Sequence, residues 1–202
     1  MKKTGLFLAT LLIGLGSFSY GQKMQVLEGN CDFLKNEKVI NIEYDYSEMS
    51  VGKFETEEGY VDKKVAEHNE KEAGKGDKWK ASWEGSRQRV YHPKFEQLFN
   101  KVLAKRGLSA AQDATDAKYT LIVKTTFLEP GFNIGIVKKA AATNLEYIFV
   151  ETESKNVVAK FSQNGIPGAQ AMGMDFDGST RISESYAKGG KMLAGFIYKK
   201  LK

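Results

Sequence analysis

The chain of 202 residues is poor in the residue types that most often carry chemistry, with one cysteine, two histidines and three prolines. A lone cysteine, Cys31, cannot form an internal disulfide bond, so the fold must depend on the burial of apolar side chains. We expect Cys31 to be a buried free thiol, with pairing between two chains as the alternative. His68 and His92 lack the HExxH spacing of a zinc-binding helix, and the sequence has neither a GxSxG motif nor a Walker loop. The sequence therefore contains no direct sign of a catalytic centre.

A strong excess of charge of one sign is also missing. The chain has 30 lysines and arginines against 25 aspartates and glutamates, which is a formal net charge of +5. Loss of the first 21 residues, which contain two lysines and no acid, leaves about +3. Nucleic-acid binding normally uses a clustered basic face, so we predict no nucleic-acid partner. No motif points to a cofactor, and we expect none.

A long apolar run occurs only at the N-terminus, in MKKTGLFLATLLIGLGSFSYGQ. Two lysines precede an apolar stretch from Leu6 to Leu15, and small and polar residues follow it up to Gln22. This is the layout of a secretory signal peptide, and the stretch is shorter than the roughly 20 residues of a transmembrane helix. We therefore expect residues 1–21 to be a signal peptide and the protein to be exported, to the periplasm or outside the cell, without a transmembrane anchor.

Residues 22–202 are numerous enough for one domain with a hydrophobic core. We expect the first part, residues 22–37, to be a short arm or strand. Residues 38–46 alternate apolar and polar side chains with the period of a half-buried strand.

Helical signals follow this strand. Thr56 can cap a helix that ends at Gly74. Two more helices come next, the first capped by Asp77 and the second begun by Pro93, and Gly107 ends the last of them.

The second half of the chain is mainly strand. Residues 119–128, 144–152 and 156–162 favour strands, and the short link between the last two predicts antiparallel neighbours. A final helix is expected over residues 179–200. The order is therefore strand, three helices, three strands and helix, and the first strand should be parallel to the second. We predict an α+β fold, a two-layer sandwich with a mixed sheet of four or slightly more strands and helices mainly on one face.

A resemblance extends over nearly all of the chain after residue 21. It is carried by the runs EKVINIEYDYSEMSVGKF, NEKEAGKGDKWKASWEGSRQRVYHPKFEQLFN and GFNIGIVKKAAATNLEYIFVET. They resemble a group of uncharacterised secreted proteins of Bacteroidetes-type bacteria, which implies export to the envelope but no particular activity. More loosely, the order of elements, with DAKYTLIV opening the central strand, is similar to small periplasmic α/β domains such as the N-terminal domain of TolB. That similarity implies, by analogy, a binding or assembly role.

Trp79 and Trp83 lie four residues apart on one expected helix, with Arg87 one turn further along. Indole rings stack on apolar faces and guanidinium groups hold anions, so these residues could form an exposed platform for a glycan or peptide. Aromatic residues at helical spacing more often pack into a core. We favour that interpretation, in which both indoles are buried.

The segment GMDFDGSTRISE, residues 173–184, matches half of a calcium-binding loop. If Gly178 is the turn glycine, Asp175, Asp177 and Glu184 occupy positions of carboxylate ligands. The first ligand position lacks an aspartate, and acids before a helix also stabilise its N-terminus without a metal. We therefore expect no metal site and keep the three carboxylates only as a calcium candidate.

The connection FLEPGFNIGIVKKAAATNLEY is longer than the two to five residues of most hairpins. It places Phe132 and Ile134 beside Lys138 and Lys139, which makes an apolar patch with a basic edge. The spacing of PGFNIG is not that of a dinucleotide-binding loop. The patch could meet a partner or a membrane surface, but we favour an arrangement in which it folds back over the sheet.

We predict an exported envelope protein that acts as a non-enzymatic binding or assembly module. It would use the 130–139 loop or the Trp79 helix to bind an envelope protein or a glycan. The alternative is a periplasmic hydrolase that acts on glycan or peptide through carboxylates. An enzyme requires a concave pocket that contains a carboxyl group with a shifted pKa, whereas a binding module requires only an exposed patch for its partner.

Overall fold

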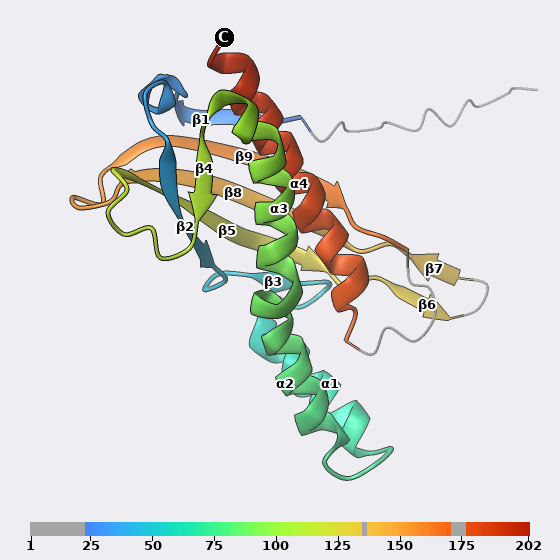
Figure 1. The fold of residues 1–202 in the computed structure, drawn as a ribbon. Coiled ribbons are helices and arrows are strands. Elements are labelled where there is room, and N and C mark those ends of the chain that lie inside the picture. The colour runs from blue at the N-terminus through green and yellow to red at the C-terminus, as the bar shows by residue number, and fades with distance from the viewer. Residues whose placement is uncertain (1–22, 135–136, 171–176) are drawn as a thin grey trace, which may run out of the picture.

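The computed structural model describes residues 23–134, 137–170 and 177–202 (Figure 1). The expected signal peptide at residues 1–21 lies outside the described residues. The described elements form one open mixed sheet with helices on one face, so the predicted α+β class is confirmed.

The main sheet has seven strands in the spatial order β1-β9-β8-β5-β2-β4, with β3 also beside β5. Strand β2 is parallel to its neighbours β4 and β5, as predicted for β2 and β5, whereas β5, β8, β9 and β1 pair antiparallel. The strands are β1 (Gln25–Gly29), β2 (Val39–Asp45), β3 (Ser50–Val51), β4 (Ser109–Ala111), β5 (Tyr119–Glu129), β8 (Ala142–Glu151) and β9 (Val157–Pro167).

The four strands expected from the sequence are β2, β5, β8 and β9, and the structure adds three short ones. Strand β1 forms in the segment where an arm or strand was expected, and pairs with β9. Strands β3 and β4 have only two and three residues. Segments this short show no recognisable period in sequence.

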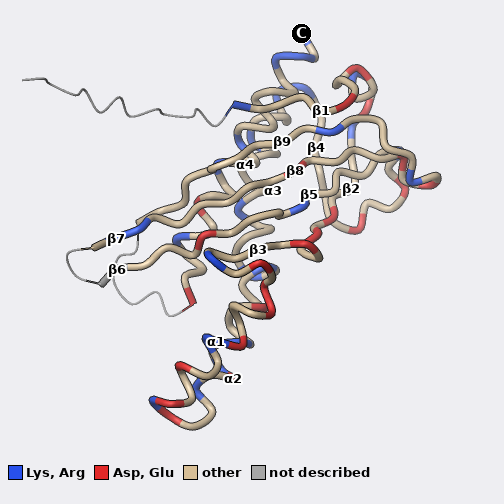
Figure 2. The backbone as a smooth tube through the Cα atoms, turned by 180° about the vertical axis from the view of Figure 1, so that it is seen from behind, with Lys and Arg blue, Asp and Glu red and all other residues tan. Residues whose placement is uncertain are grey.

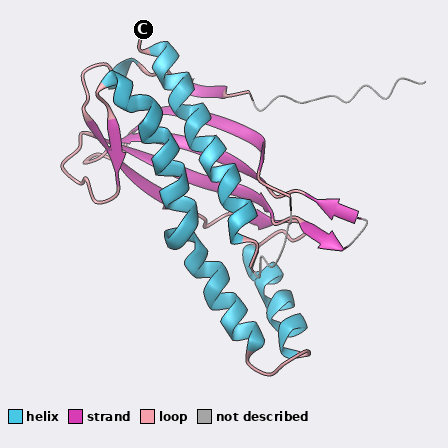
Figure 3. Cartoon of the chain, turned by 45° about the vertical axis from the view of Figure 1, so that its right-hand side comes forward, coloured by secondary structure: helices cyan, strands magenta, loops and turns pink. Residues whose placement is uncertain are grey.

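The helices are α1 (Glu57–Asn69), α2 (Lys75–Ser86), the π-helical segment η2 (Arg87–Tyr91), α3 (His92–Leu103) and α4 (Ser179–Lys200), with 3-10 turns η1 (Asp32–Leu34) and η3 (Ala104–Arg106). Helices α3 and α4 lie side by side across one face of the sheet, and α1 and α2 extend beyond it (Figures 1 and 3). The opposite face of the sheet carries no helix in the described part of the chain (Figure 2).

Two helix boundaries differ from the sequence prediction. Thr56 caps α1 as expected, but α1 ends at Asn69, and Gly74, with φ of 77°, caps α2 in place of Asp77. No break occurs before Pro93, because α2, η2 and α3 continue into one another. A proline ring clashes with the carbonyl four residues earlier in a regular α-helix, and the wider π turn lies where that clash would fall.

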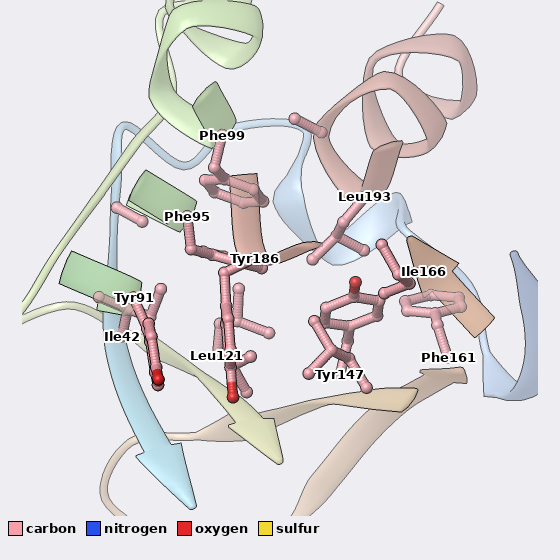
Figure 4. Packing of buried hydrophobic residues seen from close by; sticks show 14 of the residues in the cluster. Ile42, Tyr91, Phe95, Phe99, Leu121, Tyr147, Phe161, Ile166, Tyr186 and Leu193 are labelled. Atoms are coloured by element: carbon pink, nitrogen blue, oxygen red, sulfur yellow. The ribbon is translucent and has the colours of Figure 1, made fainter. Parts of the chain in front are cut away.

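The core lies between the sheet and helices α3 and α4 (Figure 4). Helix α4 buries Ile182, Tyr186, Leu193 and Ile197 along one face. A Cβ on Gly189 would lie 2.8 Å from the Leu145 side chain, so α4 touches the sheet there. Gly190 instead permits contact with α3, because a Cβ there would lie 2.4 Å from the carbonyl oxygen of Phe95.

Residues 132–134 and 137–139 form a second, two-stranded sheet, made of β6 (Phe132–Ile134) and β7 (Val137–Lys139). This hairpin projects from the body of the molecule instead of lying over the main sheet (Figures 1 and 3). The expectation that the loop folds back is therefore wrong for its described residues. Paired residues of a hairpin point to the same side, so the register places Phe132, Val137 and Lys139 on one face and Lys138 on the other.

Candidate binding site

A groove of about 420 Å³ lies where the base of the hairpin meets α1. Its walls come from residues 51–54 after β3, from one side of α1 between Tyr60 and Glu67, and from residues 129–132 with Lys139. We call it the lysine–aromatic groove, because four lysines and three aromatic residues line it: Lys53, Lys63, Lys64, Lys139, Phe54, Tyr60 and Phe132.

Tight turns hold two of these walls in place. Phe54 and Val51 exchange backbone hydrogen bonds of 2.9 and 3.0 Å, and the N–H of Gly52 donates to the carbonyl of Leu128 at 2.9 Å. This turn fixes the Phe54 ring beside the end of β5.

The opposite wall turns at Pro130 and Gly131. Gly131 has φ of 69°, and a Cβ there would lie 2.5 Å from the carbonyl oxygen of Lys139, so only glycine fits. Arg181 on α4 donates to the carbonyl of Pro130 at 2.5 Å. The base of the hairpin is therefore fastened to the helical layer.

The aromatic wall continues from the groove into the core. Tyr60 packs edge-on against Phe54, with ring centroids 5.8 Å apart, and also contacts Trp79 and Trp83 at 5.9 and 5.2 Å. Both tryptophans are only 2% exposed. The exposed indole platform considered from the sequence is therefore wrong, and the buried arrangement that we favoured is the one present. The buried tryptophans therefore pack against Tyr60, which in turn lines the groove.

The described lining of the groove carries more positive than negative charge. Glu67 pairs with Lys64 at 2.8 Å and Lys63 at 3.5 Å, and the hydrogen bond from Lys64 holds the pKa of Glu67 below its ordinary value. Glu129 pairs with Lys139 at 2.5 Å. Both acids that line the groove are thus already bound by lysines. With the residues that the structure describes, Lys53 makes no ion pair, and its Nζ lies 5.9 Å from the Phe54 ring centroid.

The hairpin residues singled out from the sequence divide between two faces. Phe132 is 40% exposed and lines the groove, as does Lys139. Lys138 is exposed on the other face of the hairpin. The side chain of Ile134 lies outside the described part of the chain.

Arg87 does not belong to this groove. Its guanidinium donates to both carboxylate oxygens of Glu57 and lies 4.1 Å from the Tyr46 ring centroid. The indole of Trp83 donates to the same carboxylate at 2.6 Å. Arg87, the first residue of η2, therefore joins α1 to the residue that follows β2, beside a separate crevice of about 890 Å³ whose lining includes five acids.

His92 is part of a buried cluster that the sequence did not reveal. Its ring stacks on Tyr44 at a centroid distance of 3.6 Å, and its Nε2 lies 3.1 Å from the hydroxyl of Tyr46. Burial and, to a smaller extent, the charge of Arg87 together lower the pKa of His92 to about 4. His92 is the first residue of α3, so its neutral imidazole packs the start of α3 against the end of β2.

The described carboxylates of the calcium candidate, Asp177 and Glu184, contact different partners. Asp177 accepts hydrogen bonds from Ser82, Ser86 and the backbone of Ser179, which joins the start of α4 to α2. Glu184 pairs with Lys94 at 3.3 Å, and Asp175 lies outside the described residues. Within the described ranges, no group of three potential ligands is placed to hold a metal ion.

Sequence reasoning missed five of the seven groove residues: Lys53, Phe54, Tyr60, Lys63 and Lys64. A weak signal exists for three of them, because Tyr60, Lys63 and Lys64 have the i, i+3, i+4 spacing of one helix face. The two residues of the turn after β3 had no such signal.

No protein-family model and no curated protein matches the chain. Solved structures show limited similarity. A neuraminyllactose-binding hemagglutinin homolog from Helicobacter pylori is 13% identical, with 87% of this chain and 88% of that chain covered and a TM-score of 0.35. The PelC dodecamer from Paraburkholderia phytofirmans is 11% identical, with 85% and 96% covered and a TM-score of 0.40.

A DUF330-family protein from Xanthomonas campestris is 13% identical, with 52% of this chain and 61% of that chain covered and a TM-score of 0.34. Similarity at this level has no bearing on what the chain binds. In the ranges that the structure describes, no helix combines the length and apolar character needed to cross a membrane.

Proposed function

We propose that the protein is an exported, non-enzymatic binding module of a bacterial envelope, which captures its partner through the lysine–aromatic groove. The observation that carries this proposal is the position of Phe132. A large apolar ring that is 40% exposed lines a concave surface together with four lysines. Exposed apolar surface with a charged rim is typical of interaction sites.

The walls of the groove are also fixed in place before a partner binds. The base of the hairpin is fastened by Arg181, and the aromatic wall is backed by buried tryptophans. A site whose walls are already positioned loses little conformational entropy when a partner enters. Export follows in this proposal from the signal-peptide pattern of residues 1–21 and from the resemblance to secreted proteins.

The hydrolase alternative has less support. A general acid in a glycosidase needs a raised pKa. In the acidic crevice, Glu57 is occupied by Arg87 and Trp83. Burial raises the pKa of Asp45, but hydrogen bonds from Ser47 and the charge of Lys124 bring it below its ordinary value. In the groove, the two glutamates are bound by lysines.

Site-specific photo-crosslinking tests the proposal. The full chain, with its own leader, is produced in the native host with a photo-reactive phenylalanine analogue at Phe132. The matched control places the analogue at Val157, which is 38% exposed on β9 and does not line the groove. We expect the protein in the envelope or secreted fraction and a discrete adduct from position 132 but not from position 157. Equal adducts at both positions, or retention in the cytoplasm, would contradict the proposal.

A further inference from the structure

We infer that the groove takes a single anionic amphiphile, a phosphate-type head joined to an apolar chain. This inference rests on the proposed function and names the chemical class of its ligand. It requires three properties of the groove to coincide: surplus positive charge, an apolar floor and a volume suited to one molecule.

The positive charge comes from lysines on both walls. Lys53 and Lys63 each place Nζ 5.9 Å from the Phe54 ring centroid, so two cations flank one ring. Lys64 and Lys139 add two more, and the only acids among the described lining residues are Glu67 and Glu129. Because those acids already pair with lysines, an anion that enters the groove meets a surplus of positive charge.

The positive charges of the groove are all on lysine side chains among its described residues, and this indicates which anionic group the ligand carries. Among the described residues that line the groove there is no arginine, asparagine or glutamine. Those side chains provide the planar, multiple hydrogen bonds that recognise sugars or carboxylates by shape. Lysine acts as a point charge and is a frequent ligand of phosphate groups. A phosphate-type head therefore fits the lining better than a neutral sugar does.

The groove also offers an apolar surface to the chain of the ligand. Phe54, Tyr60 and Phe132 line the groove together with Val51 and Pro130. Val137, which is 50% exposed, continues this surface along the hairpin, because the register places it on the same face as Phe132. An apolar chain that leaves the groove along the hairpin would cover side chains that are otherwise in contact with water.

The size of the groove favours one molecule over a protein surface. A volume of about 420 Å³ lies within the range of roughly 300–1,000 Å³ that is common for small-molecule sites. Residues of α1 and of the base of the β6–β7 hairpin line the groove, and both elements project from the main sheet (Figure 3). A concave corner of this kind admits a flexible chain more readily than a flat surface.

The test is calorimetric titration of residues 22–202 with dodecyl phosphate below its micelle concentration. Dodecyl maltoside tests the need for the anion, and inorganic phosphate tests the need for the chain. We expect measurable binding of dodecyl phosphate alone. Lys63→Glu reverses one charge at the site and should weaken binding about tenfold or more, and Phe132→Ser should also weaken it. The matched controls, Lys105→Glu and Val157→Ser, change exposed residues outside the groove and should bind as the unmodified chain does.

Several outcomes would overturn the inference. Equal binding of dodecyl maltoside would remove the role of the anion, and equal binding of inorganic phosphate would remove the role of the apolar chain. Equal loss in the Lys105→Glu control would show a general charge effect. Absence of dodecyl phosphate binding together with a protein adduct at position 132 would refute the amphiphile but leave the binding module standing. Absence of every adduct at position 132, with a protein or with a small amphiphile, together with absence of dodecyl phosphate binding, would refute the module itself.

Discussion

His92 lies between two tyrosine rings at the end of β2, where its ionisation is linked to the stability of the fold. The ring is 4% exposed, its Nε2 contacts the hydroxyl of Tyr46, and its Nδ1 is buried without a hydrogen-bond partner in the described part of the chain. Protonation would place a second N–H donor in that setting with no acceptor. Burial therefore keeps the imidazole neutral and lowers its pKa to about 4 from 6.5.

We predict that this pKa makes the protein less stable in mild acid. The unfolded chain takes up a proton at His92 below about pH 6.5, whereas the folded chain does so only near pH 4, so stability is lost as the pH falls through this window. The expected contribution between pH 7 and pH 4.5 is about 2 kcal/mol in the free energy of unfolding. Urea denaturation at both pH values measures it.

The variant His92→Gln should lose this part of the pH dependence. Burial and nearby lysines also lower the pKa of His68, so His68→Gln serves as the second variant and separates the two contributions. An identical pH dependence in the unmodified chain and His92→Gln would contradict the prediction.

Among the elements, α3 and α4 depend on close backbone contact. At Gly190 a Cβ would lie 2.4 Å from the carbonyl oxygen of Phe95, which leaves no room for a methyl group. At Gly195 on the same helix, no atom outside the local backbone lies within 4 Å of such a Cβ. The two glycines look alike in the sequence, but only one is required by packing.

We predict opposite effects of the same substitution at these two positions. Gly190→Ala should lower the free energy of unfolding by about 1–3 kcal/mol through overpacking. Gly195→Ala should raise it by up to about 1 kcal/mol, because alanine has the higher helix propensity. Urea denaturation curves of both variants provide the comparison. A Gly190→Ala variant as stable as the unmodified chain would contradict the close packing of α4 on α3.

For the whole molecule, the β6–β7 hairpin is an addition to the sheet instead of part of it. Its strands pair only with each other among the described residues, and they form a separate two-stranded sheet. The core contains buried residues from the main sheet and helices, whereas Phe132 and Val137 remain exposed. Stability and binding therefore depend on different parts of the molecule.

We predict that the hairpin can be removed without loss of the fold. Replacement of residues 132–139 by a two-residue turn should change the free energy of unfolding by less than about 1 kcal/mol, as is usual away from buried features. The same variant should lose dodecyl phosphate binding. Thermal unfolding and calorimetric titration test the two parts. A large loss of stability would show that the hairpin supports the core.

The sequence predicted the parts of this fold that depend on local periodicity. The four long strands and the final helix were found because each is long enough to show a period, and Thr56 was identified as a cap from its neighbours. The signal peptide, the export of the protein and the resemblance to secreted proteins and to TolB-type domains stay predictions. The predicted class, an α+β sandwich, is confirmed.

What the sequence determined by itself was therefore the identity of the main elements, because alternating or helical patterns of apolar residues follow from the geometry of strands and helices. Only the tertiary structure decided how those elements meet. It turned the β6–β7 hairpin outward in its described residues and brought Lys53 and Phe54 beside Phe132, almost 80 residues further along the chain. Such meetings depend on long-range packing and on single turns, as at Gly131, and neither leaves a repeating pattern in the sequence.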